Sequence, residues 1–197
     1  MENRELELAI GDGTPGGAAH GRARVVRFAR LLGYDERLLL HLGRYHGPLR
    51  TRLARLLTRL GDGGSWTIAS LALLAPARSA PTHLALRLAA GAILGASTAQ
   101  ILKRTLNRAR PTSAIAGFEA LAENPDAFSF PSGHTAAAFG VAAALAGEPY
   151  HAGPLSLLLA TGIALSRVYL GAHYPLDVVA GALAGTGAGA VARLLVQ

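Results

Sequence analysis

The chain has 197 residues, of which 51% are hydrophobic and only 16% are charged, and its formal net charge is +7. In soluble domains about a quarter of the residues are charged, so this composition favours a membrane protein. The absence of cysteine excludes disulfides and thiolate metal sites. Aromatic residues make up 6% and no nucleic-acid-binding motif is present, so the positive charge indicates contact with anionic lipid head groups rather than with nucleic acid.

The N-terminal part of the chain is polar. Residues 1–35 are predicted to form a flexible tail, and they lack the apolar segment of a signal peptide. Residues 36–197 are predicted to form one membrane domain. Its first part, residues 36–60, alternates leucines with arginines at helical spacing, and Gly47 and Pro48 are expected to break it into two helices. Such an amphipathic lead-in suits either the membrane interface or the surface of a helix bundle.

Five apolar stretches follow, at residues 65–77, 83–102, 133–148, 154–170 and 176–195. Alanine and glycine dominate them, and small residues let membrane helices approach closely. In the last stretch Gly181, Gly185 and Gly189 recur every four residues, which favours helix packing within the chain over dimerisation. The sequence therefore predicts an all-α, integral-membrane bundle of five to six helices, the sixth being the lead-in if it also crosses the membrane.

The longest connection, residues 112–130, joins the second apolar stretch to the third. Loops of this length inside a compact domain usually have a function. Because this loop lies between the two most polar parts of the membrane region, it is predicted to form a lid or an entrance.

The first polar cluster, KRTLNRARP, directly follows the second apolar stretch. Lys103 and Arg110 are seven residues apart, which is two helical turns, so they are expected to share one helix face. Arg104 and Arg108, four residues apart, would share a different face. Pro111 is expected to end the helix. The positive-inside rule would also explain basic residues here, but not their spacing.

The second cluster, PSGH, opens the third apolar stretch. Ser132 is predicted to cap the helix, and Gly133 lets the backbone approach a ligand closely. Free amide groups and the positive end of the helix dipole make such a start an anion site. His134 lies in the first turn, beside that anion site.

The third cluster, SRVYLGAHYPLD, joins the fourth stretch to the fifth. Arg167 ends the fourth, and Pro175 suits the first position of the fifth. His173 and Asp177 are four residues apart, so the carboxylate is expected to reach the imidazole ring and orient it. A histidine held by an acid is typical of a nucleophile or a base, and a local capping pair is the alternative.

Helices that alternate across a membrane would bring these three clusters to the same side. The assembled groups would be Lys103, Arg110, Ser132, His134, Arg167, His173 and Asp177. Three cations, two histidines and one carboxylate suit a phosphate ester, which arginine binds through two hydrogen bonds and lysine as a point charge. The apolar region of the sequence lacks the carboxylate cluster that holds divalent ions in phosphoryl transfer. The sequence therefore predicts neither a metal nor another cofactor.

The three motifs K-x6-RP, PSGH and SR-x5-H-x3-D, at residues 103–111, 131–134 and 166–177, occur in this order. Together they resemble the signature of the type 2 phosphatidic acid phosphatases, whose superfamily includes the vanadium haloperoxidases. The likeness covers residues 55–195. It implies an all-α bundle with its site at one end, in a protein that crosses a bacterial inner (plasma) membrane several times. The implied reaction is hydrolysis of a membrane lipid phosphate or diphosphate of the phosphatidyl or polyprenyl type.

The resemblance also implies a role for each residue. His173 would attack phosphorus and form a phosphohistidine, and Asp177 would orient its ring. His134 would protonate the leaving oxygen and then activate the hydrolytic water. The phosphoryl oxygens would be bound by Lys103, Arg110, Ser132, Gly133 and Arg167.

Two other functions fit parts of the pattern. A vanadate-dependent haloperoxidase would use the same residues, but those relatives are generally larger and soluble. A protein that only binds anionic lipids would need the cations without His173 and Asp177 at their spacing. The sequence leaves open which lipid is the substrate, which side of the membrane the site faces, and the oligomeric state.

Overall fold

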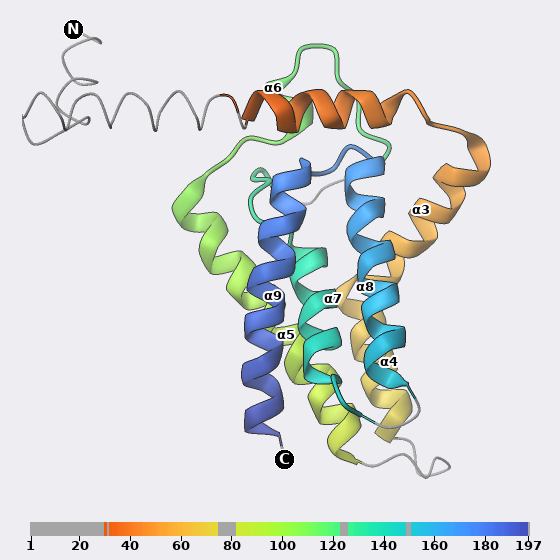
Figure 1. Cartoon of the computed structure of the whole chain (residues 1–197), viewed down its shortest axis with the longest axis vertical. Helices are drawn as coiled ribbons and strands as arrows, with labels where there is room; N and C mark the ends of the chain where they lie inside the picture. The colour runs from red at the N-terminus through yellow and green to blue at the C-terminus, as the bar shows by residue number, and fades with distance from the viewer. Residues whose placement is uncertain (1–29, 31, 75–81, 123–125, 149–150, 197) are drawn as a thin grey trace, which may run out of the picture. The chain divides into compact units, whose positions relative to one another are not determined.

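The computed structural model describes residues 30, 32–74, 82–122, 126–148 and 151–196. The chain divides into two compact units, residues 1–38 and 39–197, and a helical stretch at residues 32–43 passes through the boundary. The predicted tail lies almost entirely outside the described residues. The later helices, labelled in Figure 1, are α3 (Pro48–Leu60), α4 (Gly63–Leu74), α5 (Thr82–Leu106), α6 (Pro111–Ala114), α7 (Gly133–Ala144), α8 (Ala152–Tyr169) and α9 (Pro175–Leu195).

The all-α fold class is confirmed. The five predicted apolar stretches form α4, α5, α7, α8 and α9, and α3 begins at Pro48, where the break in the lead-in is expected. Within the described residues, strand-like pairing is limited to an isolated bridge between Ala109 and Phe128.

The part of the lead-in that forms α3 packs on α8 of the bundle. The hydroxyl groups of Thr51 and Tyr169 lie 3.2 Å apart. Farther along, Leu57 faces Gly162, where an added Cβ atom would lie 3.3 Å from the leucine side chain. The opposite side of α3 leaves Leu49 exposed. Of the two predicted positions, this segment therefore takes the one on the bundle and still presents leucines outward.

Helix α7 is buried among α5, α8 and α9 (Figure 1). Glycines allow this close packing: an added Cβ atom at Gly140 would overlap the carbonyl group of Gly91 in α5. On α9, a Cβ atom at Gly185 would overlap the carbonyl of Ala136, and one at Gly189 would overlap that of Gly140. The small-residue pattern of the last stretch is therefore used within the chain, as predicted.

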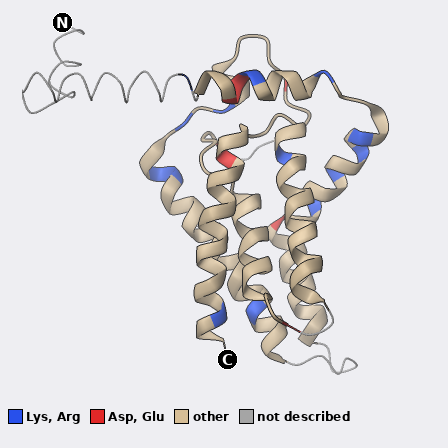
Figure 2. Cartoon of the chain, in the orientation of Figure 1, with Lys and Arg blue, Asp and Glu red and all other residues tan. Residues whose placement is uncertain are grey.

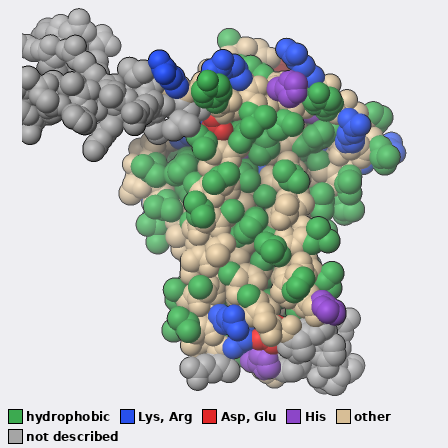
Figure 3. Space-filling model, in the orientation of Figure 1, with side chains coloured by type: hydrophobic (Ala, Val, Ile, Leu, Met, Phe, Trp, Pro, Cys, Tyr) green, Lys and Arg blue, Asp and Glu red, His purple; other side chains and the backbone are tan. Residues whose placement is uncertain are grey.

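Within the part of the chain that the structure describes, three helices, α5, α8 and α9, are long and apolar enough to cross a membrane, and α4 is a shorter apolar helix. The outward faces of these three long helices carry exposed side chains such as Ile101, Leu158 and Leu183. In α5, α8 and α9 the charged residues lie near the helix ends, and the middles of α8 and α9 are uncharged (Figure 2). Hydrophobic side chains cover much of the visible face (Figure 3). Apolar side chains exposed over whole helices suit hydrocarbon and not water, so this is a membrane protein.

One local prediction is wrong. Helix α5 ends at Leu106, and Asn107 has a left-handed φ of 38°, so Arg110 lies beyond the helix and does not share a face with Lys103. Pro111 does not end α5 but begins the short helix α6, with Arg110 at the N-cap position. A periodicity argument fails here because asparagine tolerates the left-handed conformation that ends a helix.

Candidate active site

A cavity of about 760 Å³ opens where α5 and α8 end and α7 begins. Six of the eight predicted site residues line it: Lys103, Arg110, Gly133, His134, Arg167 and His173. The other two, Ser132 and Asp177, are completely buried behind it. The structure therefore brings together groups that are far apart in the sequence.

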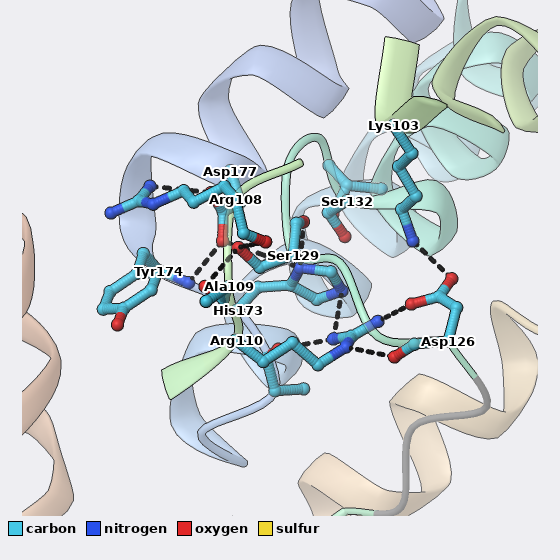
Figure 4. A network of polar contacts seen from close by, with 12 residues as sticks. Lys103, Arg108, Ala109, Arg110, Asp126, Ser129, Ser132, His173, Tyr174 and Asp177 are labelled. Carbon is cyan, nitrogen blue, oxygen red and sulfur yellow. Dashed lines mark hydrogen bonds and ion pairs between the residues drawn. The ribbon is translucent and has the colours of Figure 1, made fainter. Parts of the chain in front are cut away.

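Lys103 and Arg110 converge on a carboxylate of the chain itself. Lys103 Nζ lies 2.5 Å from Oδ2 of Asp126, and the Arg110 guanidinium forms an ion pair with Oδ1 and donates to the Asp126 carbonyl oxygen at 2.7 Å (Figure 4). Burial alone would raise the pKa of Asp126, but the hydrogen bonds from Lys103 and Arg110 outweigh it and lower that pKa. Asp126 belongs to the loop predicted to form a lid or entrance. It forms ion pairs with Lys103 and Arg110, two of the cations expected to bind phosphate.

The third cation, Arg167, reaches the cavity from the end of α8. It is buried, and its Nη1 donates to Thr58 Oγ1 at 2.6 Å. Thr58 lies near the end of α3. The amphipathic lead-in therefore supplies a partner to the site, which its leucine and arginine pattern did not indicate.

The ring of His173 is held between two groups. Its Nδ1–H donates to the carbonyl oxygen of Ser129 at 2.8 Å, and its Nε2 lies 3.4 Å from Nη1 of Arg110 (Figure 4). Burial lowers the pKa of His173 to about 4, against the raising effect of Asp177, and the charges of Arg167 and Arg110 lower it further. At neutral pH the ring is therefore uncharged, and its unprotonated Nε2 accepts a long hydrogen bond from Arg110, which an electrophile at Nε2 would replace.

Asp177 lies near His173, but its main partners are different from the predicted one. Its Oδ2 is 3.7 Å from His173 Nδ1, while its Oδ1 accepts from Arg108 Nη1 at 2.7 Å. Oδ2 also accepts from the backbone amide of Tyr174 at 2.9 Å, in a capping box at the start of α9. The i, i+4 spacing correctly predicts proximity, but the shorter contacts of Asp177 are the ion pair with Arg108 and the capping bond from Tyr174.

His134 forms a second pair of a histidine with a carboxylate. Its Nε2 lies 2.7 Å from Oδ1 of Asp62, which lies in the turn between α3 and α4. Ser132 occupies the N-cap position as expected, but its hydroxyl accepts from Thr135 Oγ1 at 3.0 Å instead of capping the helix. Gly133 has open space around its Cα atom and lines the cavity. Its position lets a ligand approach the helix start.

Sequence reasoning missed four contributors to this site. They are Thr58, Asp62, Arg108 and Asp126. Thr58, Asp62 and Asp126 lie outside the three motifs, and Arg108 is at an unspecified position of the first motif. No local spacing links any of the four to its partner. Among the described residues, no three His, Asp or Glu side chains gather as metal ligands.

The cavity continues as an apolar groove between α4 and α5. On the α5 side, lining residues recur at helical spacing from Ala89 to Lys103. This part of the groove is about 21 Å long, at a rise of 1.5 Å per residue. Most of this wall consists of small side chains, and the α4 side adds larger ones. The lining includes Trp66, Ser70, Leu71, Leu74, Ala92, Ile93, Ala96 and Ser97. The polar site is therefore joined to a groove suited to a hydrocarbon chain.

The sequence profile of the PAP2 superfamily matches residues 84–197. A decaprenylphosphoryl-5-phosphoribose phosphatase of Mycolicibacterium smegmatis is 35% identical over 128 residues, which are 65% of this chain and 69% of that protein. An undecaprenyl-diphosphatase of Sulfolobus acidocaldarius is 33% identical over 88 residues, 44% of this chain and 43% of that one. The crystal structure of Aquifex aeolicus LpxE has a TM-score of 0.67 and 30% identity, covering 79% of this chain and 92% of LpxE. The resemblance carried by the three motifs is confirmed, and the chain belongs to the PAP2 superfamily.

Proposed function

We propose that this membrane lipid phosphatase acts on a polyprenyl phosphate or diphosphate and forms a phosphohistidine at His173. The observation that carries the proposal is the continuity of one cavity, which joins three cations and two histidines to an apolar groove along α4 and α5. A lipid phosphate has this same division into a charged head and a hydrocarbon tail. The two curated relatives reported above are both named as phosphatases of polyprenyl-linked substrates.

The first chemical step is an in-line attack by Nε2 of His173 on phosphorus. The bond between phosphorus and the ester or diphosphate oxygen breaks, and that oxygen takes a proton from His134. Lys103, Arg110 and Arg167 bind the remaining phosphoryl oxygens, with the amide of Gly133 as a further donor. Ser132 would act through its N-cap position at the helix start, since its hydroxyl accepts a hydrogen bond from Thr135.

The second step reverses the role of His134. Now neutral, it accepts a proton from a water molecule that attacks the phosphohistidine. The phosphorus–nitrogen bond breaks, inorganic phosphate is formed, and His173 recovers its uncharged ring. Throughout, the bond from Nδ1–H to the Ser129 carbonyl keeps the ring orientation fixed.

We place the enzyme in the plasma membrane of a bacterium as a multi-pass protein, with the lipid tail entering from the bilayer. Three helices of spanning length and an active site at one end of the bundle support this location. The head group would then lie near the membrane surface, where phosphate and water can exchange.

The test is phosphate release by detergent-purified protein in the presence of EDTA. The substrate panel holds a polyprenyl phosphate, a polyprenyl diphosphate, phosphatidic acid, phosphatidylglycerol phosphate and a water-soluble phosphomonoester. Vanadate-sensitive release from the polyprenyl substrates, abolished in His173→Ala, is the expected result. Release that needs an added divalent metal would contradict the mechanism. Preference for a phosphatidyl substrate would retain the mechanism and correct the lipid class.

Retained lipid binding separates catalysis from binding. The His173→Ala variant should still bind a polyprenyl phosphate in detergent micelles, because all three cations remain. Unchanged phosphate release in this variant would rule out the phosphohistidine.

A further inference from the structure

Arg108 contacts both of the groups that face the Nδ1 side of His173. Its carbonyl oxygen accepts from the Ser129 amide at 2.8 Å, which fixes the residue whose own carbonyl binds His173 Nδ1. Its side chain donates to Asp177, the other group near Nδ1 (Figure 4). One residue at an unspecified position of the first motif therefore holds both neighbours of the nucleophile.

The ion pair between Arg108 and Asp177 balances a buried charge. Asp177 is 0% exposed, and a buried carboxylate is costly unless a cation and hydrogen bonds compensate it. Arg108 supplies the cation at 2.7 Å, and the Tyr174 amide supplies a further hydrogen bond. The guanidinium carbon of Arg108 also lies 3.9 Å from the centroid of the Tyr174 ring. Arg108 is thereby held to the residue that follows His173.

We infer that Arg108 is a positioning residue for His173, because it holds the Asp177 carboxylate as its own partner and leaves Nδ1–H on the Ser129 carbonyl. This inference rests on the proposed role of His173 as nucleophile. The orientation matters because Nδ1–H on Ser129 directs Nε2 toward the cavity. Loss of Arg108 would leave a buried carboxylate 3.7 Å from Nδ1 without this cation, and the ring proton would be drawn to it.

Such a loss also changes the charge balance at His173. The charged groups that face its ring are Asp177 from α9, Arg110 from the segment after α5, and Arg167 from α8. Arg108 offsets the first of these. Without it, Asp177 favours the protonated imidazolium more strongly, so His173 needs a higher pH to become neutral. The acid limb of kcat/KM should therefore move to higher pH.

The test compares Arg108→Gln with Arg104→Gln, the same change at an exposed arginine four residues earlier. We expect Arg108→Gln to lower kcat about 10²-fold, as for a misplaced reacting group, with a small change in KM and a raised acid limb. Arg104→Gln should keep the wild-type values. Arg108→Lys, which retains the charge, should recover part of kcat. Equal kcat values and pH profiles in the two glutamine variants would overturn the inference.

A double-mutant cycle with Asp177→Asn separates positioning from a general loss of stability. If Arg108 acts through Asp177, adding Arg108→Gln to Asp177→Asn should cause little further loss of kcat, whereas independent effects would multiply. Multiplying effects, with thermal unfolding in detergent unchanged, would overturn the inference. An inactive wild-type protein would instead overturn the proposed function. If the wild type is active and Arg108→Gln has the same kcat and pH profile as the wild type, the inference on Arg108 is overturned and the proposed function is retained.

Discussion

The carboxylate of Asp126 lies against the ammonium group of Lys103, with Oδ2 2.5 Å from Nζ. Arg110 pairs with the other carboxylate oxygen. Both cations are therefore compensated by the chain before any substrate arrives. A phosphoryl group that binds them has to displace Asp126 or tolerate its negative charge nearby.

Replacing Asp126 with asparagine should therefore strengthen phosphate binding. We expect the inhibition constant for vanadate or inorganic phosphate to fall about tenfold, the scale of one charge-assisted hydrogen bond. Glu119→Gln, at an exposed carboxylate of the same loop, is the control and should leave it unchanged. A higher inhibition constant in Asp126→Asn would show that Asp126 instead holds the two cations in a geometry that favours binding.

The low pKa of His173 predicts an unusual acid limb. A histidine with a pKa of about 4 remains neutral as the pH falls from 7 to 5, whereas an ordinary histidine becomes protonated near 6.5. Since only the neutral ring attacks phosphorus, kcat/KM should keep the contribution of His173 down to about pH 4. The substrate also ionises for the second time near pH 6. This pKa is measured separately, and its effect is subtracted from the pH profile of kcat/KM. A remaining limb near pH 6.5 would contradict this environment for His173.

The pair formed by His134 and Asp62 predicts a dependence on the leaving group. Burial and the charge of Arg167 lower the pKa of His134, and the Asp62 carboxylate 2.7 Å from Nε2 works against them by favouring the protonated ring that donates to the leaving oxygen. His134→Gln should lower kcat for the lipid substrate by about 10²- to 10³-fold, and Asp62→Asn by about tenfold. Both losses should shrink with p-nitrophenyl phosphate, whose leaving group needs little protonation.

The matched control for Asp62 is Glu148→Gln. Glu148 likewise pairs with a histidine, since its Oε2 lies 3.2 Å from Nε2 of His83. His83 lies at the start of α5, at the opposite end of that helix from Lys103. Glu148→Gln should keep the wild-type ratio of activities on the two substrates. A loss of the same size on both substrates in Asp62→Asn would point to a structural role for that residue.

The groove along α5 predicts that a mutation can impair binding of the lipid tail without affecting hydrolysis at the phosphate head group. Ala96 lines the cavity away from the cations, so Ala96→Phe should fill the groove and raise KM for a polyprenyl substrate about tenfold or more. The same variant should hydrolyse a water-soluble phosphomonoester at the wild-type rate. Leu183→Phe, at an exposed position of α9 outside the cavity, is the control. Equal losses on both substrates would exclude the groove as the tail site.

The sequence was sufficient to predict the apolar helices and the convergence of their ends. Hydrophobic runs and turn residues determine α5, α8 and α9, and motif order brings His134 and His173 to one side. The end of α7 was predicted too late: the expected stretch ran to residue 148, but the helix ends at Ala144, followed by Gly147 with a φ of 82°. An apolar composition predicts burial better than it predicts where a helix ends.

The partners of the site groups could not be predicted in the same way. Lys103 and Arg110 do converge, but through the folding of the segment after Asn107 and not through a shared helix face. Asp62 and Asp126 reach the site from turns whose positions depend on tertiary packing. Periodicity relates residues within one helix and carries no information about such contacts.

The glycine contacts of α7 have a consequence for how such an enzyme can change. At the chemical end, α7 is held to α5 and α9 by backbone against backbone, so spacing there cannot be adjusted by exchanging side chains. The groove between α4 and α5 is shaped by side chains and can be altered one substitution at a time. Mutation can therefore diversify the choice of lipid tail while the phosphate chemistry is inherited unchanged.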